Sequence, residues 1–272
     1  MFSPRIEKTE GIVLRVSGFS NTSQMVAWLT PDRGRLTTSA KGACRPRSPF
    51  LGQYDLYYTC EIVYYAHARQ GVHVLRECAP LDTRPRFRTD WRASLSASYA
   101  TDLVNRVSEE SPAAPDLYGL LRAALDHLAL HGVSPAALLA FECRLPTILG
   151  IPPDLEGCPH CAESAYADRA RFSVPDGRLV CPACSPDAAQ AEITLTRRQL
   201  ALLRLAFAAD VYAPSVFARL PAADTALLRR FLGIFLHYHL DARLDGRAIA
   251  WDALADARVQ ARGASPAGCA AG

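Results

Sequence analysis

The sequence predicts an α+β protein with a five-stranded β-barrel, followed by an α-helical domain that carries a small inserted β-ribbon. Three observations predict this class. Short runs of strand-forming residues, separated by turn residues, fill the first third of the 272-residue chain. Beyond residue 85 the apolar residues recur at helical spacing, and two Cys-x-x-Cys pairs interrupt this part. We place the barrel at residues 1–82, the helical domain at 83–254 and the ribbon at about 155–188.

Five strand-like runs alternate with turns rich in glycine, proline, serine and asparagine. The runs span residues 11–16, 24–30, 35–40, 54–66 and 72–77. Five short strands in about 80 residues, with no convincing helix among them, favour a small closed barrel. The five-stranded OB barrel is the natural candidate. An SH3-like barrel has the same pattern and stays open as an alternative.

Apolar stripes at helical spacing predict five helices in the remainder. These span residues 91–107, 117–130, 136–145, 196–208 and 223–244. Pro146 is expected to kink or end the third helix, because proline lacks the backbone N–H and clashes with the preceding turn. Residues 255–272, rich in alanine, glycine and arginine without periodicity, are expected to form a disordered tail.

The two cysteine pairs have the spacing of a four-thiolate zinc site. Nineteen residues separate the pairs, whose members are Cys158, Cys161, Cys181 and Cys184. Residues 171–174 and 178–180 flank a Pro-Asp-Gly turn and predict a hairpin that brings the pairs together. Four thiolates close the zinc shell, so we expect one structural Zn²⁺ ion that takes no part in chemistry. Disulfides or a redox motif are weaker alternatives, since no feature of the sequence indicates secretion.

Positive charge is concentrated in the N-terminal third. Residues 1–90 contain 13 Lys or Arg and 8 Asp or Glu, whereas the whole chain has a net charge of +3. The segment between residues 33 and 47 contains no acid and ends in an open loop with Gly42, Pro46 and Pro49. We predict that this cluster contacts phosphates, which suit arginine's multiple donors. Its members are Arg33, Arg35, Lys41, Arg45 and Arg47, with Arg15 as a weaker candidate.

Aromatic residues near these cations suggest base stacking. Tyr54, Tyr57 and Tyr58 follow the loop, and stacking aromatics beside a cationic groove are typical of barrels that bind single strands. The alternative is a packing role, since alternate tyrosines of a strand face the core. A second basic-aromatic cluster surrounds Trp91 at the entrance of the first helix and consists of Arg84, Arg86, Arg88 and Arg92. This cluster either extends a nucleic-acid track from the barrel or solvates the start of the helix.

The sequence lacks local catalytic motifs. It contains no GxxxxGK[ST] phosphate-binding loop, and no cluster of closely spaced carboxylates suggests two-metal nuclease chemistry. We therefore expect no enzyme activity. No apolar run approaches the ~20 residues of a membrane span, and the N-terminus lacks the apolar segment of a secretory signal. We expect a cytoplasmic protein with no membrane partner.

Six short motifs occur in order along the N-terminal third. They are Glu10-Gly-Ile-Val-Leu14, Ser20-Asn-Thr-Ser23, Leu29-Thr30, Gly34-Arg-Leu36, Ala40-Lys-Gly-Ala43 and Arg45-Pro-Arg-Ser48. This series resembles the opening of the bacterial DNA repair protein RecO family, and the resemblance spans about residues 5–245. The sequence departs from the family pattern at residues 20–23, where an acid is usual, and at Cys44, where the family often has arginine.

The resemblance implies a recombination mediator rather than an enzyme. Such a protein binds single- and double-stranded DNA, anneals complementary strands, and works with RecR and the single-strand-binding protein to load recombinase. The resemblance also implies association with the nucleoid in the cytoplasm, and some family members carry a four-cysteine zinc element in the helical domain. Two other classes stay open: a zinc-dependent nucleic-acid enzyme such as a nuclease, and a protein-interaction module whose basic loop is only solvated.

Overall fold

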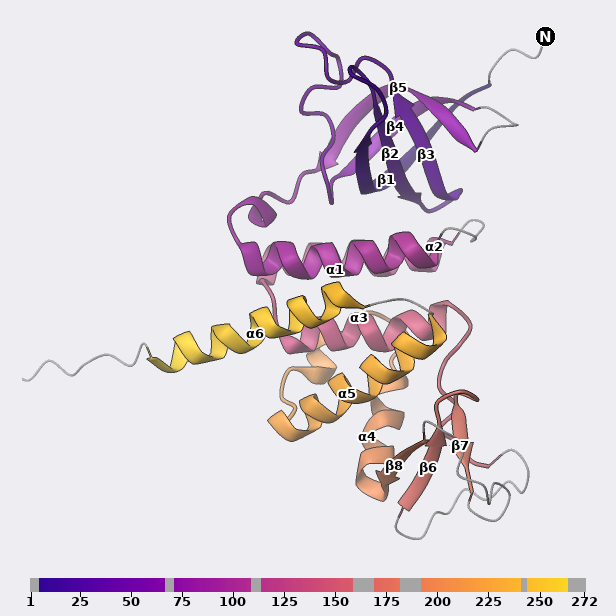
Figure 1. Ribbon diagram of the computed structural model, residues 1–272, viewed down its shortest axis with the longest axis vertical. Helices are drawn as coiled ribbons and strands as arrows, with labels where there is room; N and C mark the ends of the chain where they lie inside the picture. Colours follow the sequence, from indigo (N-terminus) through magenta and orange to yellow (C-terminus); the bar gives the residue numbers. More distant parts are fainter. Residues whose placement is uncertain are drawn as a thin grey trace, which may run out of the picture.

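The computed structural model describes residues 5–66, 71–108, 114–158, 169–181, 192–240 and 244–263. Figure 1 shows a β-barrel at one end of the molecule, layers of helices beneath it and a small sheet at the opposite end. The barrel strands are β1 (Arg5–Gly18), β2 (Gln24–Thr30), β3 (Gly34–Ala40), β4 (Thr59–Ala66) and β5 (Val72–Asp82). The other elements are η1 (Pro85–Arg88), α1 (Trp91–Val107), α2 (Pro115–His131), α3 (Pro135–Ile148), β6 (Arg169–Ser173), β7 (Arg178–Val180), β8 (Glu192–Thr196), α4 (Arg197–Phe207), η2 (Pro214–Phe217), α5 (Ala222–His239) and α6 (Asp245–Gly263).

The five N-terminal strands close into a barrel in the order β1-β2-β3-β5-β4, which confirms the predicted closed five-stranded barrel. Strands β3 and β5 pair in parallel, and the other neighbours are antiparallel. This architecture agrees with the OB type. Strand β1 begins at Arg5 rather than at residue 11, and β4 begins at Thr59 rather than at residue 54. Residues 54–58 therefore belong to the loop before β4.

Strands β1 and β2 bury both of their faces along residues 11–14 and 26–30, because the barrel is packed against the helices. Val13 and Trp28 lie in the core of the barrel. Ile12, Leu14 and Leu29 belong instead to the core of the helical domain. Neighbouring residues of a strand face opposite sides, so one run of apolar residues contributes to both cores. The two domains therefore share a continuous apolar interface.

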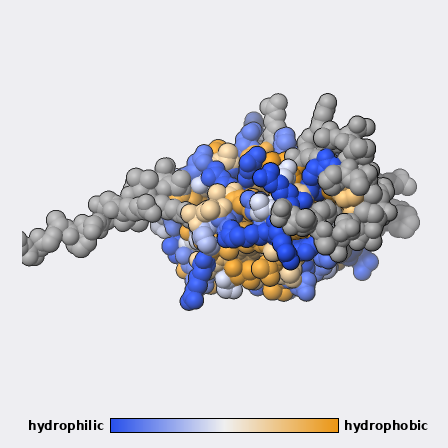
Figure 2. Space-filling model, turned by 90° about the horizontal axis from the view of Figure 1, so that it is seen from below, coloured by the Kyte–Doolittle hydropathy of each residue, from blue (hydrophilic) through white to orange (hydrophobic). Residues whose placement is uncertain are grey.

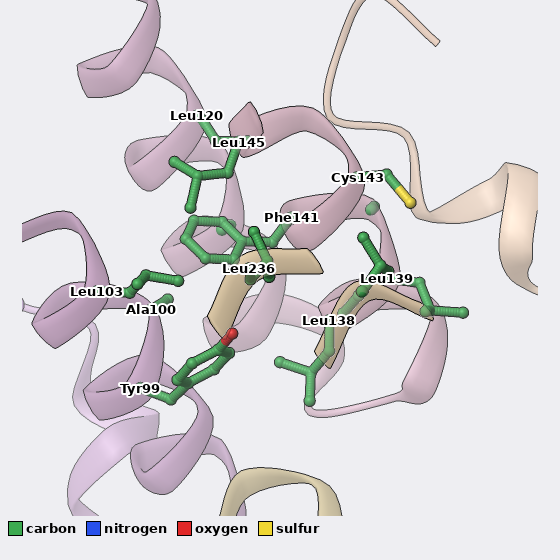
Figure 3. Close-up of a cluster of buried hydrophobic side chains, with 14 of the residues drawn as sticks. Tyr99, Ala100, Leu103, Leu120, Leu138, Leu139, Phe141, Cys143, Leu145 and Leu236 are labelled. Carbon is green, nitrogen blue, oxygen red and sulfur yellow. The ribbon is translucent and has the colours of Figure 1, made fainter. Parts of the chain in front are cut away.

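The helical core is centred on α3, between α1 and α5. Figure 3 shows Phe141 of α3 among Leu103 of α1 and Leu236 of α5, all of them buried. Helix α1 has the predicted bounds because Asp90 caps it, and its carboxylate accepts the backbone N–H of Ala93 at 3.2 Å.

Helix α3 and the small sheet each extend beyond what the sequence predicted. Helix α3 runs through Pro146 and ends two residues later, at Ile148. Proline lacks the backbone N–H, so Pro146 removes one hydrogen bond of the helix. Because it lies in the last turn, this loss does not interrupt the helix before its end at Ile148. The predicted hairpin is confirmed as β6 and β7, and a third strand, β8, pairs with β6.

The C-terminal prediction is wrong in two respects. The helix expected over residues 223–244 is shorter than predicted, since α5 ends at His239, and a further helix that was not predicted, α6, begins at Asp245. Helix α6 continues to Gly263, so the disordered tail expected from residue 255 does not begin there; residues 264–272 lie outside the described chain. Trp251 and Leu254 of α6 are buried in the helical core, and this packing stabilises a helix whose sequence has few large apolar residues.

The end of the molecule away from the barrel has a mixed surface. Figure 2 views this end and shows hydrophobic areas between hydrophilic residues. None of the helices in the described chain is long and apolar enough to cross a membrane.

Candidate nucleic-acid interface

The loop that follows β3 presents three cations to solvent. Lys41, Arg45 and Arg47 are exposed, and no residue in the described part of the chain forms an ion pair with them. We name residues 41–50 the basic loop. Its backbone folds into successive turns, and the side chains of Ala43 and Phe50 are buried in the barrel core. The loop is therefore anchored near both ends, and its charged side chains point outward.

The basic loop is also bonded to the turn between β1 and β2. The backbone N–H of Cys44 donates to the carbonyl of Thr22 at 3.1 Å, and that of Gly42 donates to the hydroxyl of Ser23 at 3.2 Å. Gly42 has a φ of +73°, which favours glycine at this position. In Figure 1 both loops lie at the end of the barrel away from the helices. The three cations thus belong to a preformed surface at the outer end of the barrel.

The structure separates Arg33 and Arg35 from this surface, which corrects the prediction of a single cluster. A seven-residue strand spans about 20 Å, so the two ends of β3 lie at opposite ends of the barrel. Arg33 pairs with Glu7 at 3.0 Å, and Arg35 Nε donates to Asn105 Oδ1 of α1 at 3.2 Å. These two arginines serve barrel and domain contacts. The weaker candidate, Arg15, is exposed on β1, where its backbone lies opposite that of Ala27 on β2.

None of the three tyrosines that follow the loop is exposed: Tyr58 is buried, and Tyr54 and Tyr57 are half-buried, so the structure favours their role in packing over base stacking. Tyr58 is buried in the barrel core, and Tyr57 packs edge-on against Phe87. The hydroxyl of Tyr54 donates to Gln24 Oε1 at 2.7 Å, and burial raises the pKa of Tyr54 to about 12. The exposed aromatic side chain near the basic loop is instead Phe19, which sequence reasoning missed because one aromatic residue in a polar turn has no periodic signal.

Arg84 is the most buried of the predicted DNA contacts, with 1% of its side chain exposed. Its Nε and Nη2 atoms donate to Asp126 Oδ1 of α2 at 2.9 and 2.6 Å. Its Nη1 atom donates to Thr59 Oγ1 of β4 at 3.0 Å. Arg84 therefore joins the barrel to the helices and cannot reach a nucleic acid, which corrects its predicted role.

The other arginines of the second cluster differ in their contacts. Arg86 pairs with Asp90 at 3.2 Å, and Arg88 pairs with Asp55 at 3.5 Å. The guanidinium of Arg92 lies 4.7 Å from the ring centroid of the exposed Trp91. Arg88 also lies over an aromatic ring, that of the buried Tyr58, at 5.4 Å, so the basic-aromatic contact with an exposed ring is that of Arg92 with Trp91.

The structure describes half of the predicted zinc site. Cys158 and Cys181 are buried, whereas Cys161 and Cys184 lie outside the described residues. Asp154 forms a parallel bridge with Arg178, so the chain runs from these two residues toward Cys158 and Cys181 in the same direction. Within the described ranges no group of three or more possible ligands gathers, and a four-cysteine site needs the two residues beyond them. Two buried thiols on adjacent segments fit half of such a site.

Comparison with known proteins identifies the family. Residues 4–84 match the model of the recombination protein O N-terminal domain, and residues 88–248 match that of the C-terminal domain. The chain is 32% identical over 177 residues to the DNA repair protein RecO of Desulforudis audaxviator, covering 65% of this chain and 70% of the relative. It is 28% identical over 240 residues to the RecO protein of Anaeromyxobacter sp. strain K, covering 88% of this chain and 94% of the relative. The chain belongs to the recombination protein O family of DNA repair proteins.

Proposed function

We propose that this protein is a DNA-binding recombination mediator without enzyme activity, and that the basic loop holds the DNA backbone. The observation that carries the proposal is the set of three exposed cations, Lys41, Arg45 and Arg47, on a loop fixed to the outer end of the barrel. Hydrogen-bonded turns fix the backbone of the loop, so little backbone order remains to be imposed when a phosphate chain binds.

The proposed activity is binding of single- and double-stranded DNA and annealing of complementary strands. Cations that neutralise phosphates on two strands reduce the repulsion between those strands while their bases pair. Each neutralised phosphate releases condensed counterions, so affinity falls with salt. Three phosphate contacts correspond to a slope of about −2 in log K against log salt on single-stranded DNA.

Family membership supports the proposed partners. We propose that this protein acts with RecR and the single-strand-binding protein to load recombinase. We also propose that it associates with the nucleoid. The cofactor of the proposal is one structural zinc ion held by Cys158, Cys161, Cys181 and Cys184. In this role the ion would fix the small sheet at the far end of the molecule and would take no part in DNA chemistry.

The test is a gel-shift titration with single-stranded DNA across several salt concentrations. A variant with Lys41, Arg45 and Arg47 all replaced by alanine should bind more weakly at physiological salt and show a smaller salt slope. The matched control removes three exposed arginines far from the loop, Arg106, Arg178 and Arg230, and changes the net charge equally. Equal losses in both variants, or none in the first, would contradict the proposal. Cleaved strands in the presence of divalent metal would favour a nuclease instead.

A further inference from the structure

We propose that Phe19 is a stacking platform for unpaired bases, which makes the outer end of the barrel selective for single-stranded DNA. This inference rests on the proposed function and adds a base contact to the phosphate contacts of the basic loop. The ligand is a nucleobase whose flat face is not covered by a neighbouring base.

Exposure distinguishes Phe19 from the other phenylalanines. Of the phenylalanines that the structure describes, Phe19 alone is exposed, with 67% of its surface accessible, and the rest are buried or half-buried. An apolar ring in water gains free energy when a flat apolar surface covers it. The residues on either side are small or polar, with Gly18 before it and Ser20 after it. A β-carbon added at Gly18 would meet nothing within 4 Å, so no other element covers the chain just before Phe19.

The turn that carries Phe19 is ordered. The backbone N–H of Phe19 donates to the carbonyl of Ser23 at 2.9 Å, and that of Ser20 donates to the same carbonyl at 3.2 Å. An ordered turn loses little conformational freedom when a base stacks on the ring it presents.

Hydrogen bonds place this turn directly beside the cations. Thr22 accepts the N–H of Cys44, the residue before Arg45, and Ser23 accepts the N–H of Gly42, the residue after Lys41. A strand whose phosphates lie along the basic loop can therefore direct a base toward the turn. Cationic grooves flanked by a stacking ring are a general solution for single-strand binding, and base–aromatic stacking does not depend on sequence.

The same geometry separates single strands from duplexes. In a duplex both faces of each internal base are covered by its neighbours, so Phe19 gains no contact there. The basic loop reaches phosphates in either form. Phe19 should then contribute to the affinity for single strands alone, and the cations to the affinity for both.

The experiment compares Phe19→Ala with the wild-type protein on three probes: a labelled single-stranded oligothymidine, an abasic oligonucleotide of equal length, and a blunt duplex. Loss of one stacked base should weaken oligothymidine binding about tenfold and leave the other two probes unchanged. Phe19→Trp should bind oligothymidine as tightly as the wild type. The fluorescence of the added tryptophan should be quenched by oligothymidine but not by the abasic strand. Leu130→Ala, an equally exposed apolar residue on α2, is the control and should change nothing.

Several results would overturn the inference. Unchanged oligothymidine binding by Phe19→Ala, together with weakened binding by the triple basic-loop variant, would remove the stacking role and leave the proposed function intact. Unchanged binding by both variants would remove the proposed function as well. Equal weakening on all three probes would assign Phe19 to support of the loop.

Discussion

Arg247 of α6 holds both carboxylate oxygens of Glu142 of α3, with Nε at 2.8 Å from Oε1 and Nη2 at 2.7 Å from Oε2. Glu142 has no exposed surface. The hydroxyl of Tyr99 and the indole N–H of Trp251 also donate to Oε1, at 3.0 and 3.1 Å. Residues of α1, α3 and α6 thus meet at one buried carboxylate, which fixes the C-terminal helix to the helical core.

Replacing Glu142 by alanine should lower the free energy of unfolding by about 3–5 kcal/mol, because Arg247 would be left as an uncompensated charge in the interior. Urea unfolding curves measure this loss. Replacing Asp102, which forms an exposed pair with Arg106 at 2.9 Å, should cost about 0.3–0.5 kcal/mol and is the control. Similar losses at both sites would show that the buried pair contributes no more than a surface pair.

Arg84 should behave as a residue of the domain junction. Its replacement by alanine removes charged hydrogen bonds to Asp126 and Thr59, at an expected cost of about 1.5–3 kcal/mol in the free energy of unfolding. Protease cleavage between the barrel and the helices should accelerate, and the phosphate-dependent part of DNA binding should persist. Arg86→Ala is the neighbouring control, and it should alter neither measurement strongly. A selective loss of DNA affinity in stable Arg84→Ala protein would restore this arginine to the DNA surface.

The salt dependence of DNA binding should distinguish the cations at the outer end of β3 from the arginines at its helix-facing end. Each single substitution of Lys41, Arg45 or Arg47 by alanine should reduce the salt slope on single-stranded DNA by about 0.7. Arg33→Ala and Arg35→Ala should leave the slope unchanged, because their partners lie on β1 and α1. A reduced slope for Arg33→Ala would mean that the helix-facing end of the barrel also binds phosphate.

Acid should weaken the folded state through His127. Burial lowers the pKa of His127 below its usual 6.5, and the charge of His131, with the two rings 4.8 Å apart, lowers it further. The folded state then binds this proton less tightly than the unfolded state. The contribution of neutral His127 to the free energy of unfolding is therefore complete above pH 6.5, and it is lost as the pH falls from 6.5 toward the lower pKa of the folded state. Unfolding measured from about pH 8 to pH 5 should show the stability gap between the wild type and His127→Gln narrowing toward acid. If the wild type instead gained stability relative to His127→Gln toward acid, the pKa of His127 would be raised in the folded state, and the prediction would be wrong.

The sequence predicted the elements better than their ends. Strand β2 and helix α1 have their predicted bounds because turn residues and the Asp90 cap mark them locally. Helix α5 ends at His239, although residues 240–244 contain neither glycine nor proline, so local preference extended the predicted helix to residue 244. Burial of Trp251 by distant helices decides the fold there, and no local pattern contains that information.

The site was predictable in charge but not in placement. Lys41, Arg45 and Arg47 are exposed as expected, since glycine and proline keep their loop open. Tyr58 and part of Tyr54 pack on the barrel core, and Tyr57 packs on the helical core, because the loop before β4 folds back between them. The sequence separation of Arg35 and Lys41 is small, yet the length of β3 lies between them.

Zinc content tests the remaining half of the ribbon prediction. Purified protein should contain about one equivalent of zinc, and substitution of Cys158 or Cys181 by serine should abolish it, because a tetrahedral site cannot spare a thiolate. Cys143→Ser is the control, since this buried thiol lies in the helical core and belongs to neither pair. Removal of the ion by a chelator should loosen β6, β7 and β8 while the barrel keeps its affinity for DNA, because the two lie at opposite ends of the molecule (Figure 1). Zinc retained by Cys158→Ser, or a metal-free protein with an unchanged thermal transition, would contradict a structural site.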